Sequence, residues 1–162
     1  MNITFTYTDI ISQVKMLTAF EGRDYVNGDG DSMFLSVVVT EQDEPLIITY
    51  INQALNALST RFERMIDDIT IADTHTTWSL RTTQTRHPKA NGATLSKHLN
   101  EAIVSYTLMN WFAERKADRV AMYSDLFNGS AELAAKNLFS KAAPTRRKQN
   151  HQDIDEVTIK VV

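Results

Sequence analysis

Residues 94–113, TLSKHLNEAIVSYTLMNWFA, form the stretch that decides the fold. Apolar side chains recur in it three and four positions apart, the spacing that places them on one face of an α-helix. They are Leu95, Leu99, Ala102, Ile103, Tyr106, Met109, Trp111, Phe112 and Ala113. Thr94 is a good N-cap residue, so the pattern predicts a loop at residues 87–92 and a helix that begins near Thr94.

A second helix is predicted after the charged stretch 114–118, ERKAD. Apolar residues continue at helical spacing from Val120 to about Ala142, and Pro144 ends the run. Two long helices joined by so short a turn are expected to lie antiparallel.

A third long helix is predicted over residues 46–66. Thr40, the acidic stretch 41–44 and Pro45 precede it, as is typical of a helix start. Its apolar face contains Ile47, Tyr50, Ile51, Ala54, Leu55, Leu58, Phe62 and Met65. A shorter helix is predicted from Thr8 or Asp9 to Gly22, whereas residues 34–39, FLSVVV, fit a strand or a buried helix equally well.

Strands are predicted near both ends of the chain and in its middle. Residues 2–7 alternate, with Ile3, Phe5 and Tyr7 on one face. Residues 68–86 are rich in Thr, Ile and Trp and predict an antiparallel hairpin with one solvent-facing side, which includes Trp78 and Leu80. Residues 157–162 alternate again, but no hairpin partner lies beside them in the sequence.

These patterns predict a mainly α fold: a bundle of three to four helices with a small antiparallel β-hairpin and extended N- and C-terminal strands. The chain of 162 residues suits one domain over residues 1–142, followed by a basic linker at 143–153 and a C-terminal β-strand arm at 154–162. A net charge of −3 gives no overall attraction to nucleic acid, and the absence of Cys excludes disulfides and thiolate metal sites. We expect neither a secretory signal nor a membrane span.

No motif points to catalysis, a cofactor or a metal. Asn27, Asp29 and Asp31 resemble the opening of a calcium-binding loop, but Ser32 stands where that loop needs Gly and Val38 where it needs Glu. The sequence contains no P-loop, dinucleotide-binding or nucleophile-elbow motif. We therefore expect a protein that is not an enzyme and uses no cofactor.

The C-terminal arm needs a partner to become ordered. Burial of Val157, Ile159 and Val161 returns about 5 to 9 kcal/mol, whereas ordering six residues costs about 6 to 12 kcal/mol. An existing sheet edge must therefore supply hydrogen bonds, either the N-terminal strand, the hairpin or the edge of a neighbouring chain. The linker reaches up to about 36 Å when it is extended.

The order of features across residues 95–147 resembles a family of small helical head-to-tail connector (adaptor) proteins of tailed bacteriophages and prophages, especially of Bacteroides-type hosts. The features are Tyr106, the pair Trp111-Phe112, the charged turn at 114–118, Tyr123, the pair Ala134-Ala135 and the exit sequence LFSKAAPTRR. The long helix followed by a Thr-rich hairpin is similar to such adaptors as well. The terminal strands lie outside the resemblance.

The resemblance implies a homo-oligomeric ring, commonly of twelve subunits, that docks below a portal protein in the virion and surrounds the DNA channel after assembly in the host cytoplasm. A tail-completion or terminator protein is an alternative, and so is a small nucleic-acid-binding regulator that uses the basic cluster. From the two terminal strands, the hairpin and the basic cluster we expect the following contacts with neighbours: Ile3, Phe5, Tyr7, Trp78, Leu80, Lys141, Arg146, Arg147, Lys148, Val157, Ile159 and Val161.

Overall fold

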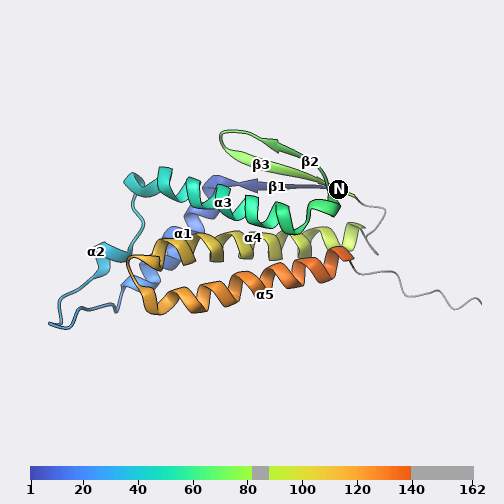
Figure 1. Cartoon of the computed structure of the whole chain (residues 1–162). Coiled ribbons are helices and arrows are strands. Elements are labelled where there is room, and N and C mark those ends of the chain that lie inside the picture. Colours follow the sequence, from blue (N-terminus) through green and yellow to red (C-terminus); the bar gives the residue numbers. More distant parts are fainter. Residues whose placement is uncertain (82–87, 140–162) are drawn as a thin grey trace, which may run out of the picture.

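The computed structural model describes residues 1–81 and 88–139 (Figure 1). Its longer elements are β1 (Asn2–Thr6), α1 (Tyr7–Gly22), α2 (Phe34–Val37), α3 (Glu44–Arg61), β2 (Ile66–Ile71), β3 (His75–Leu80), α4 (Pro88–Ala113) and α5 (Val120–Phe139). Short 3-10 helices are η1 (Glu41–Asp43), η2 (Glu63–Met65) and η4 (Ala117–Arg119). A mainly helical fold with a small antiparallel sheet is therefore confirmed.

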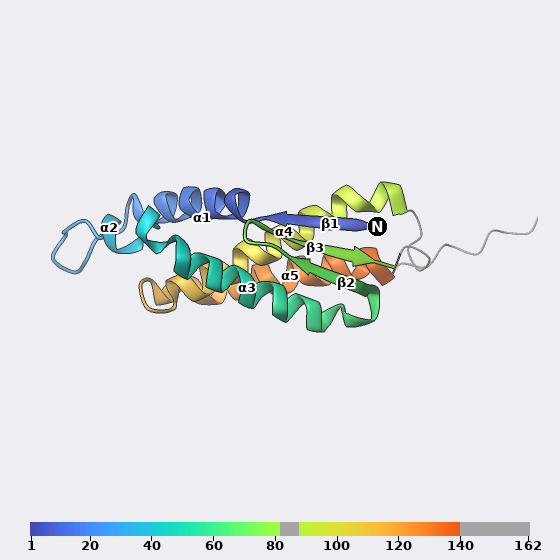
Figure 2. The same ribbon diagram turned by 90° about the horizontal axis from the view of Figure 1, so that it is seen from above.

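Helix α4 is the centre of the bundle and packs against α1, α3 and α5 (Figures 1 and 2). Most of its predicted apolar face is buried, with Leu99, Ile103 and Phe112 fully inaccessible to solvent, whereas Ala113 at the end of the helix is exposed. Helix α5 returns along α4 in the opposite direction, and the Tyr123 ring of α5 stacks on Phe112 with 5.4 Å between ring centroids. The two longest helices thus pack against each other as an antiparallel pair.

The three strands form one antiparallel sheet in the order β1-β3-β2, which lies along α3 and α4 (Figure 1). Ile3 of β1 and Ile69 of β2 both lie opposite Trp78 of β3, so these three side chains share the face that turns toward the helices. The other face carries Thr4, Thr70 and Thr77, and the hydroxyls of Thr4 and Thr77 lie 3.0 Å apart. The predicted hairpin with one solvent-facing side is confirmed, and the N-terminal strand completes its sheet.

Some element boundaries differ from the predictions. Helix α4 begins at Pro88, so the predicted loop at 87–92 is wrong where it covers residues 88–92. Proline suits the first position of a helix, because its fixed φ is already helical and its missing N–H would have no partner there. Tyr7 begins α1 instead of ending the strand, and residues 34–37 of the ambiguous stretch 34–39 form the short helix α2. Among the described residues, no helix combines the length and apolar character needed to cross a membrane.

Candidate binding groove

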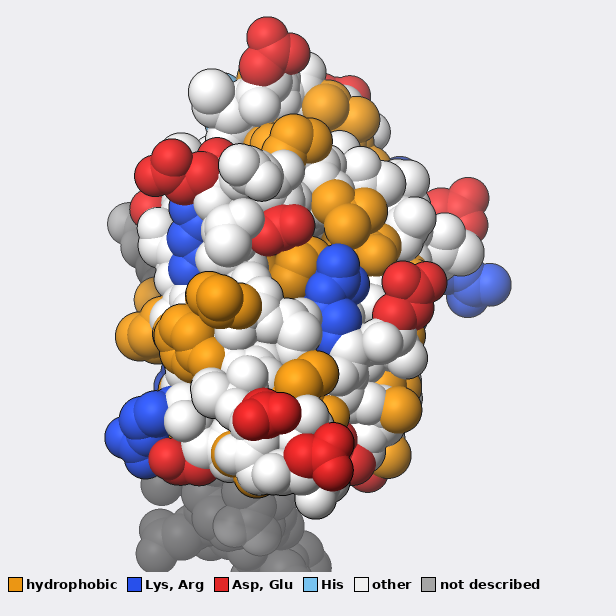
Figure 3. Space-filling view, turned by 90° about the vertical axis from the view of Figure 1, so that its left-hand side faces the viewer, with side chains coloured by type: hydrophobic (Ala, Val, Ile, Leu, Met, Phe, Trp, Pro, Cys, Tyr) orange, Lys and Arg blue, Asp and Glu red, His pale blue; other side chains and the backbone are white. Residues whose placement is uncertain are grey.

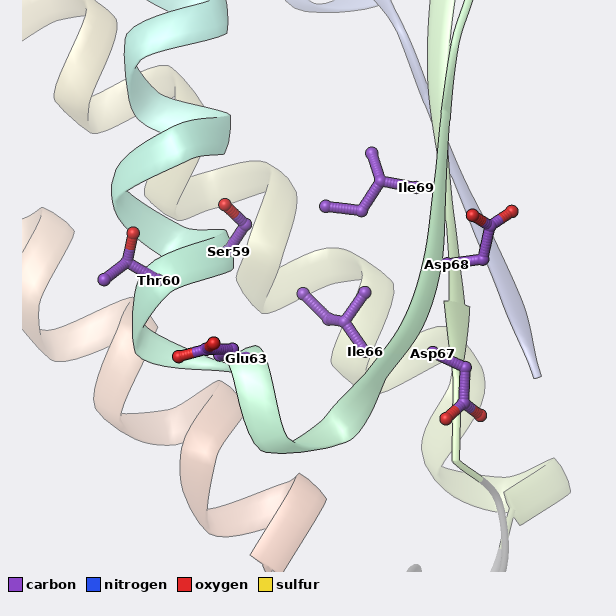
Figure 4. Close-up of a pocket in the computed structure, with 7 residues that line it drawn as sticks. All are labelled: Ser59, Thr60, Glu63, Ile66, Asp67, Asp68 and Ile69. Carbon is purple, nitrogen blue, oxygen red and sulfur yellow. The ribbon is translucent and has the colours of Figure 1, made fainter.

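A groove runs between α3 and β2, and we refer to it as the α3–β2 groove. It exists because β2 is an edge strand whose inward side chains lie beyond the cover of the helices. Ile3 and Phe5 of β1 are at most 4 % exposed, whereas Ile69 and Ile71 of β2 are 38 % and 72 % exposed on the same face of the sheet. Figure 4 shows Ile66 and Ile69 directed toward α3 across this space.

The groove consists of two adjoining hollows that share Ser59 and Ile69. The inner hollow has a volume of about 160 Å³ and a mainly apolar lining, formed by Asn52, Leu55, Asn56, Ser59, Ile69, Ile71, Thr76 and Trp78. The outer hollow has a volume of about 510 Å³ and is more polar, with Ser59, Thr60, Glu63, Ile66, Asp67, Asp68 and Ile69 around it (Figure 4). The groove therefore offers an apolar floor with an acidic end.

Trp78 forms part of the floor of the inner hollow. It is 1 % exposed, and its ring meets Phe5 edge to face at 5.1 Å. Its indole Nε1–H has no hydrogen-bond partner, although a buried donor normally has one. The other tryptophan, Trp111, is equally buried and donates from Nε1 to the Val37 carbonyl at 2.6 Å. The floor of the inner hollow thus includes a buried indole whose N–H group is unpaired inside the protein.

The free edge of β2 presents main-chain hydrogen-bonding groups. The Ala72 amide donates to the His75 carbonyl at 2.9 Å, and hydrogen-bonded pairs alternate along an antiparallel ladder. Thr70 therefore bonds to Thr77 in β3, while the N–H and C=O groups of Ile69 and Ile71 point away from the sheet. The two residues whose side chains face the groove are also those whose backbone is open to a further strand.

The carboxylates at the acidic end have no metal-binding arrangement. Arg81 forms an ion pair with Asp67, and Asp68 accepts a 3.4 Å hydrogen bond from the Thr70 hydroxyl. In residues 1–81 and 88–139, no group of three or more His, Asp or Glu side chains could hold a metal ion. In the loop 27–31, Asn27 Oδ1 accepts hydrogen bonds from the amides of Asp29 and Asp31, which is a turn geometry.

A buried ionic cluster joins the end of α1 to the turn between α4 and α5. Lys116 is 7 % exposed and its Nζ donates to the Glu21 carbonyl at 2.9 Å and to Glu21 Oε2 at 3.1 Å. Arg119 Nε lies 2.9 Å from the same Oε2 without the alignment of a hydrogen bond. Burial, with the Glu21 carboxylate nearby, raises the pKa of Tyr123 to about 12. Since Glu21 pairs with both cations and joins two parts of the chain that are far apart in the sequence, we interpret the cluster as a structural clamp.

The clamp lies at the end of the bundle that Figure 3 shows, where apolar and acidic side chains are interspersed over the surface. Leu35 of α2 is 85 % exposed and Phe20 near the end of α1 is 67 % exposed.

The predicted contact residues fall into two groups. Ile3, Phe5, Tyr7, Trp78 and Leu80 are buried in the core of their own chain, because β1 pairs with β3 and both strands pack on the helices. Their side chains have almost no surface left for a neighbour, so we correct their interpretation as contact residues. The remaining predicted residues lie outside the described part of the chain: Lys141, Arg146, Arg147, Lys148, Val157, Ile159 and Val161.

The exposed isoleucines of β2 were missed, although the alternation Ile69-Thr70-Ile71 is visible in the sequence. Alternation predicts that they share a face, but not that this face extends past the helices. Comparison of the chain with protein-family models, with characterised proteins and with solved structures finds no match.

Proposed function

We propose that this chain is a structural subunit of a phage head-to-tail connector, which forms a ring below the portal and surrounds the DNA channel in the virion. The observation that carries the proposal is the presence of two different unpartnered apolar surfaces, the α3–β2 groove and a second groove between α1 and α5. The resemblance of residues 95–147 to connector proteins supplies the biological setting.

The second groove, which we call the α1–α5 groove, has a volume of about 430 Å³ and its floor is formed by α4. Its lining residues are Gln13, Leu17, Glu101, Val104, Ser105, Leu108, Met122, Tyr123, Leu126 and Ser130. Met122 and Leu126 of α5 line this groove and are 36 % and 48 % exposed. Large apolar side chains are thus exposed within the groove, a feature that marks interaction surfaces.

A ring requires two surfaces that differ from each other, because each subunit contacts its two neighbours through opposite sides. Helix α4 lies between the two grooves, with α3 and the sheet on one side and α1 and α5 on the other (Figures 1 and 2). A chain that formed only a two-fold dimer would use one self-complementary surface. The arrangement therefore favours a closed ring over a simple dimer.

The role needs no catalytic group or cofactor. Asp and Glu outnumber Lys and Arg in the chain, 20 to 17, which suits a conduit that DNA must pass without binding tightly.

Native mass spectrometry of the full chain, alone and with a co-expressed portal protein, tests the proposal. We expect ring-sized oligomers, alone or on the portal, that Leu126→Glu abolishes by placing a charge in the α1–α5 groove. Leu35→Glu is the matched control, because Leu35 is exposed but lies outside both grooves. Monomers under every condition would overturn the proposal.

A nucleic-acid-binding regulator makes a different prediction. Binding to duplex DNA that falls steeply with added salt, and that is lost when Lys141, Arg146, Arg147 and Lys148 are all changed to Ala, would replace the connector proposal.

A further inference from the structure

We propose that the α3–β2 groove receives residues 157–162 of a second copy of this chain, which add a fourth strand to the sheet at the edge of β2. The inference rests on the proposed ring and names the contact that links one subunit to the next.

Of the two sheet edges, β2 fits an apolar strand. The inward side chains of β1, Ile3 and Phe5, are already buried by the helices. The inward side chains of β2, Ile69 and Ile71, are exposed, and their backbone groups point outward as derived above. A strand that pairs with Ile69 and Ile71 would place every second side chain on the groove face, because residues opposite each other share a face.

The arm has the pattern that this edge requires. In VTIKVV, Val157, Ile159 and Val161 alternate with Thr158 and Lys160. If Ile159 lies opposite Ile69 in an antiparallel pair, Val157 lies opposite Ile71 and both enter the groove. The inner hollow of about 160 Å³ is similar in size to cavities that hold a benzene molecule, so it has room for the Ile159 side chain.

The charge of Lys160 favours this register over a shifted one. Counting from Ile159 opposite Ile69, Thr158 lies opposite Thr70 and Lys160 lies opposite Asp68, an opposite-charge pair on the solvent face. A shift by two residues in the direction that brings Val161 opposite Ile69 would move Lys160 to Thr70 and lose that pair. A shift by one residue would turn the apolar side chains away from the groove.

The chain between α5 and the arm has the length that a contact with a neighbour requires. Helix α5 ends at Phe139, so 17 residues precede Val157, with an extended reach of up to about 61 Å. This stretch is therefore long enough to reach the sheet of a neighbouring subunit.

Disulfide trapping in the full chain tests the contact, and the absence of native Cys leaves no background. In the proposed register Thr70 and Thr158 form a non-hydrogen-bonded pair with Cα atoms about 4.5 Å apart, within the range for a disulfide. Both positions lie on the solvent face, so the double variant T70C/T158C leaves the core intact. The control T4C/T158C places the acceptor thiol on the solvent face of the opposite edge strand, β1.

After mild oxidation, non-reducing gels are expected to show a ladder of covalent oligomers for T70C/T158C. Its yield should exceed that of the control by about a thousandfold, because docking raises the effective thiol concentration from micromolar to millimolar. An internal disulfide in a monomer would overturn the assignment to a second copy, and equal yields in the two variants would overturn the docking site. A ladder without closed rings supports the contact but contradicts the ring, whereas rings without a ladder contradict the contact alone.

Discussion

The buried clamp at Glu21 allows one stability prediction to be worked out in detail. The Glu21 side chain is 11 % exposed, and it faces Lys116 Nζ at 3.1 Å and Arg119 Nε at 2.9 Å. Glu21→Gln keeps the shape but leaves Lys116 as a buried cation without its counter-charge. Removal of one partner from a buried ion pair costs about 3 to 5 kcal/mol, a large part of the 5 to 15 kcal/mol typical of a folded domain.

Urea unfolding followed by circular dichroism measures this cost. With a slope of about 2 kcal/mol per molar urea, the midpoint should fall by about 2 M. Lys116→Met should cost less, because Arg119 still neutralises Glu21. The double variant E21Q/K116M should be more stable than Glu21→Gln alone, since it removes the unpaired cation.

Asp24→Asn is the matched control for the clamp. Asp24 is paired with Arg23 at 3.1 Å, but both side chains are exposed, so this loss should be about 1 kcal/mol or less. If Glu21→Gln destabilises the protein no more than Asp24→Asn does, or if the double variant loses the sum of the two single losses, the clamp is not a desolvated ion pair.

Three further predictions follow from single contacts. Trp111→Phe leaves the Val37 carbonyl without its donor and should lower the free energy of unfolding by about 1 to 3 kcal/mol, measured by urea unfolding. Trp78→Phe leaves no acceptor unpaired and should cost less. Equal losses in the two variants would contradict the different roles of the two indoles. Thr40→Ala removes the hydroxyl that donates to Asp43 at 2.7 Å and should cost about 0.5 to 2 kcal/mol at pH 7. The Thr40 hydroxyl lowers the pKa of Asp43, so this stabilisation is present above the ordinary carboxyl pKa of 3.8 and is lost as the pH falls below that value. If NMR titration gives Asp43 the same pKa in Thr40→Ala as in the unchanged protein, the cap is contradicted. The pKa of Tyr123 is raised from 10.0 to about 12, so its neutral form stabilises the fold below pH 10 and this contribution disappears as the pH rises to 12. Tyr123→Phe should therefore reduce the loss of stability between pH 10 and pH 12. An unchanged dependence of stability on pH in this variant would contradict the burial of the phenol.

The helices could be predicted from the sequence because each has an apolar face with strict spacing. Ile47, Ile51 and Leu58 of α3 are fully buried as that spacing requires. The sequence pattern predicts a start of α4 near Thr94, which is too late, because Pro88 is an equally good helix start. Local signals thus identify the elements more securely than their ends.

The candidate site could not be predicted in the same way. The alternation of residues 2–7 predicts a strand but not which strand it pairs with. The pairing of β1 with β3 buries Ile3, Phe5, Trp78 and Leu80. The unpaired indole donor of Trp78 depends on which groups happen to surround it, which no local pattern contains. The groove arises from the order of the strands relative to the helices, a property of the tertiary structure.

The edge of β2 combines features that are typical of a strand that pairs with one specific partner. Edge strands in soluble proteins are usually protected by charged or inward-pointing polar side chains, because an open apolar edge pairs with other chains. Here the charges stand only at the start of the strand, at Asp67 and Asp68, while Ile69 and Ile71 leave the rest of the edge apolar. An acidic start restricts the strands that can pair to those that present a cation at that position. An apolar edge limited in this way suits one charged and alternating partner, and the C-terminal segment of the same sequence has that pattern.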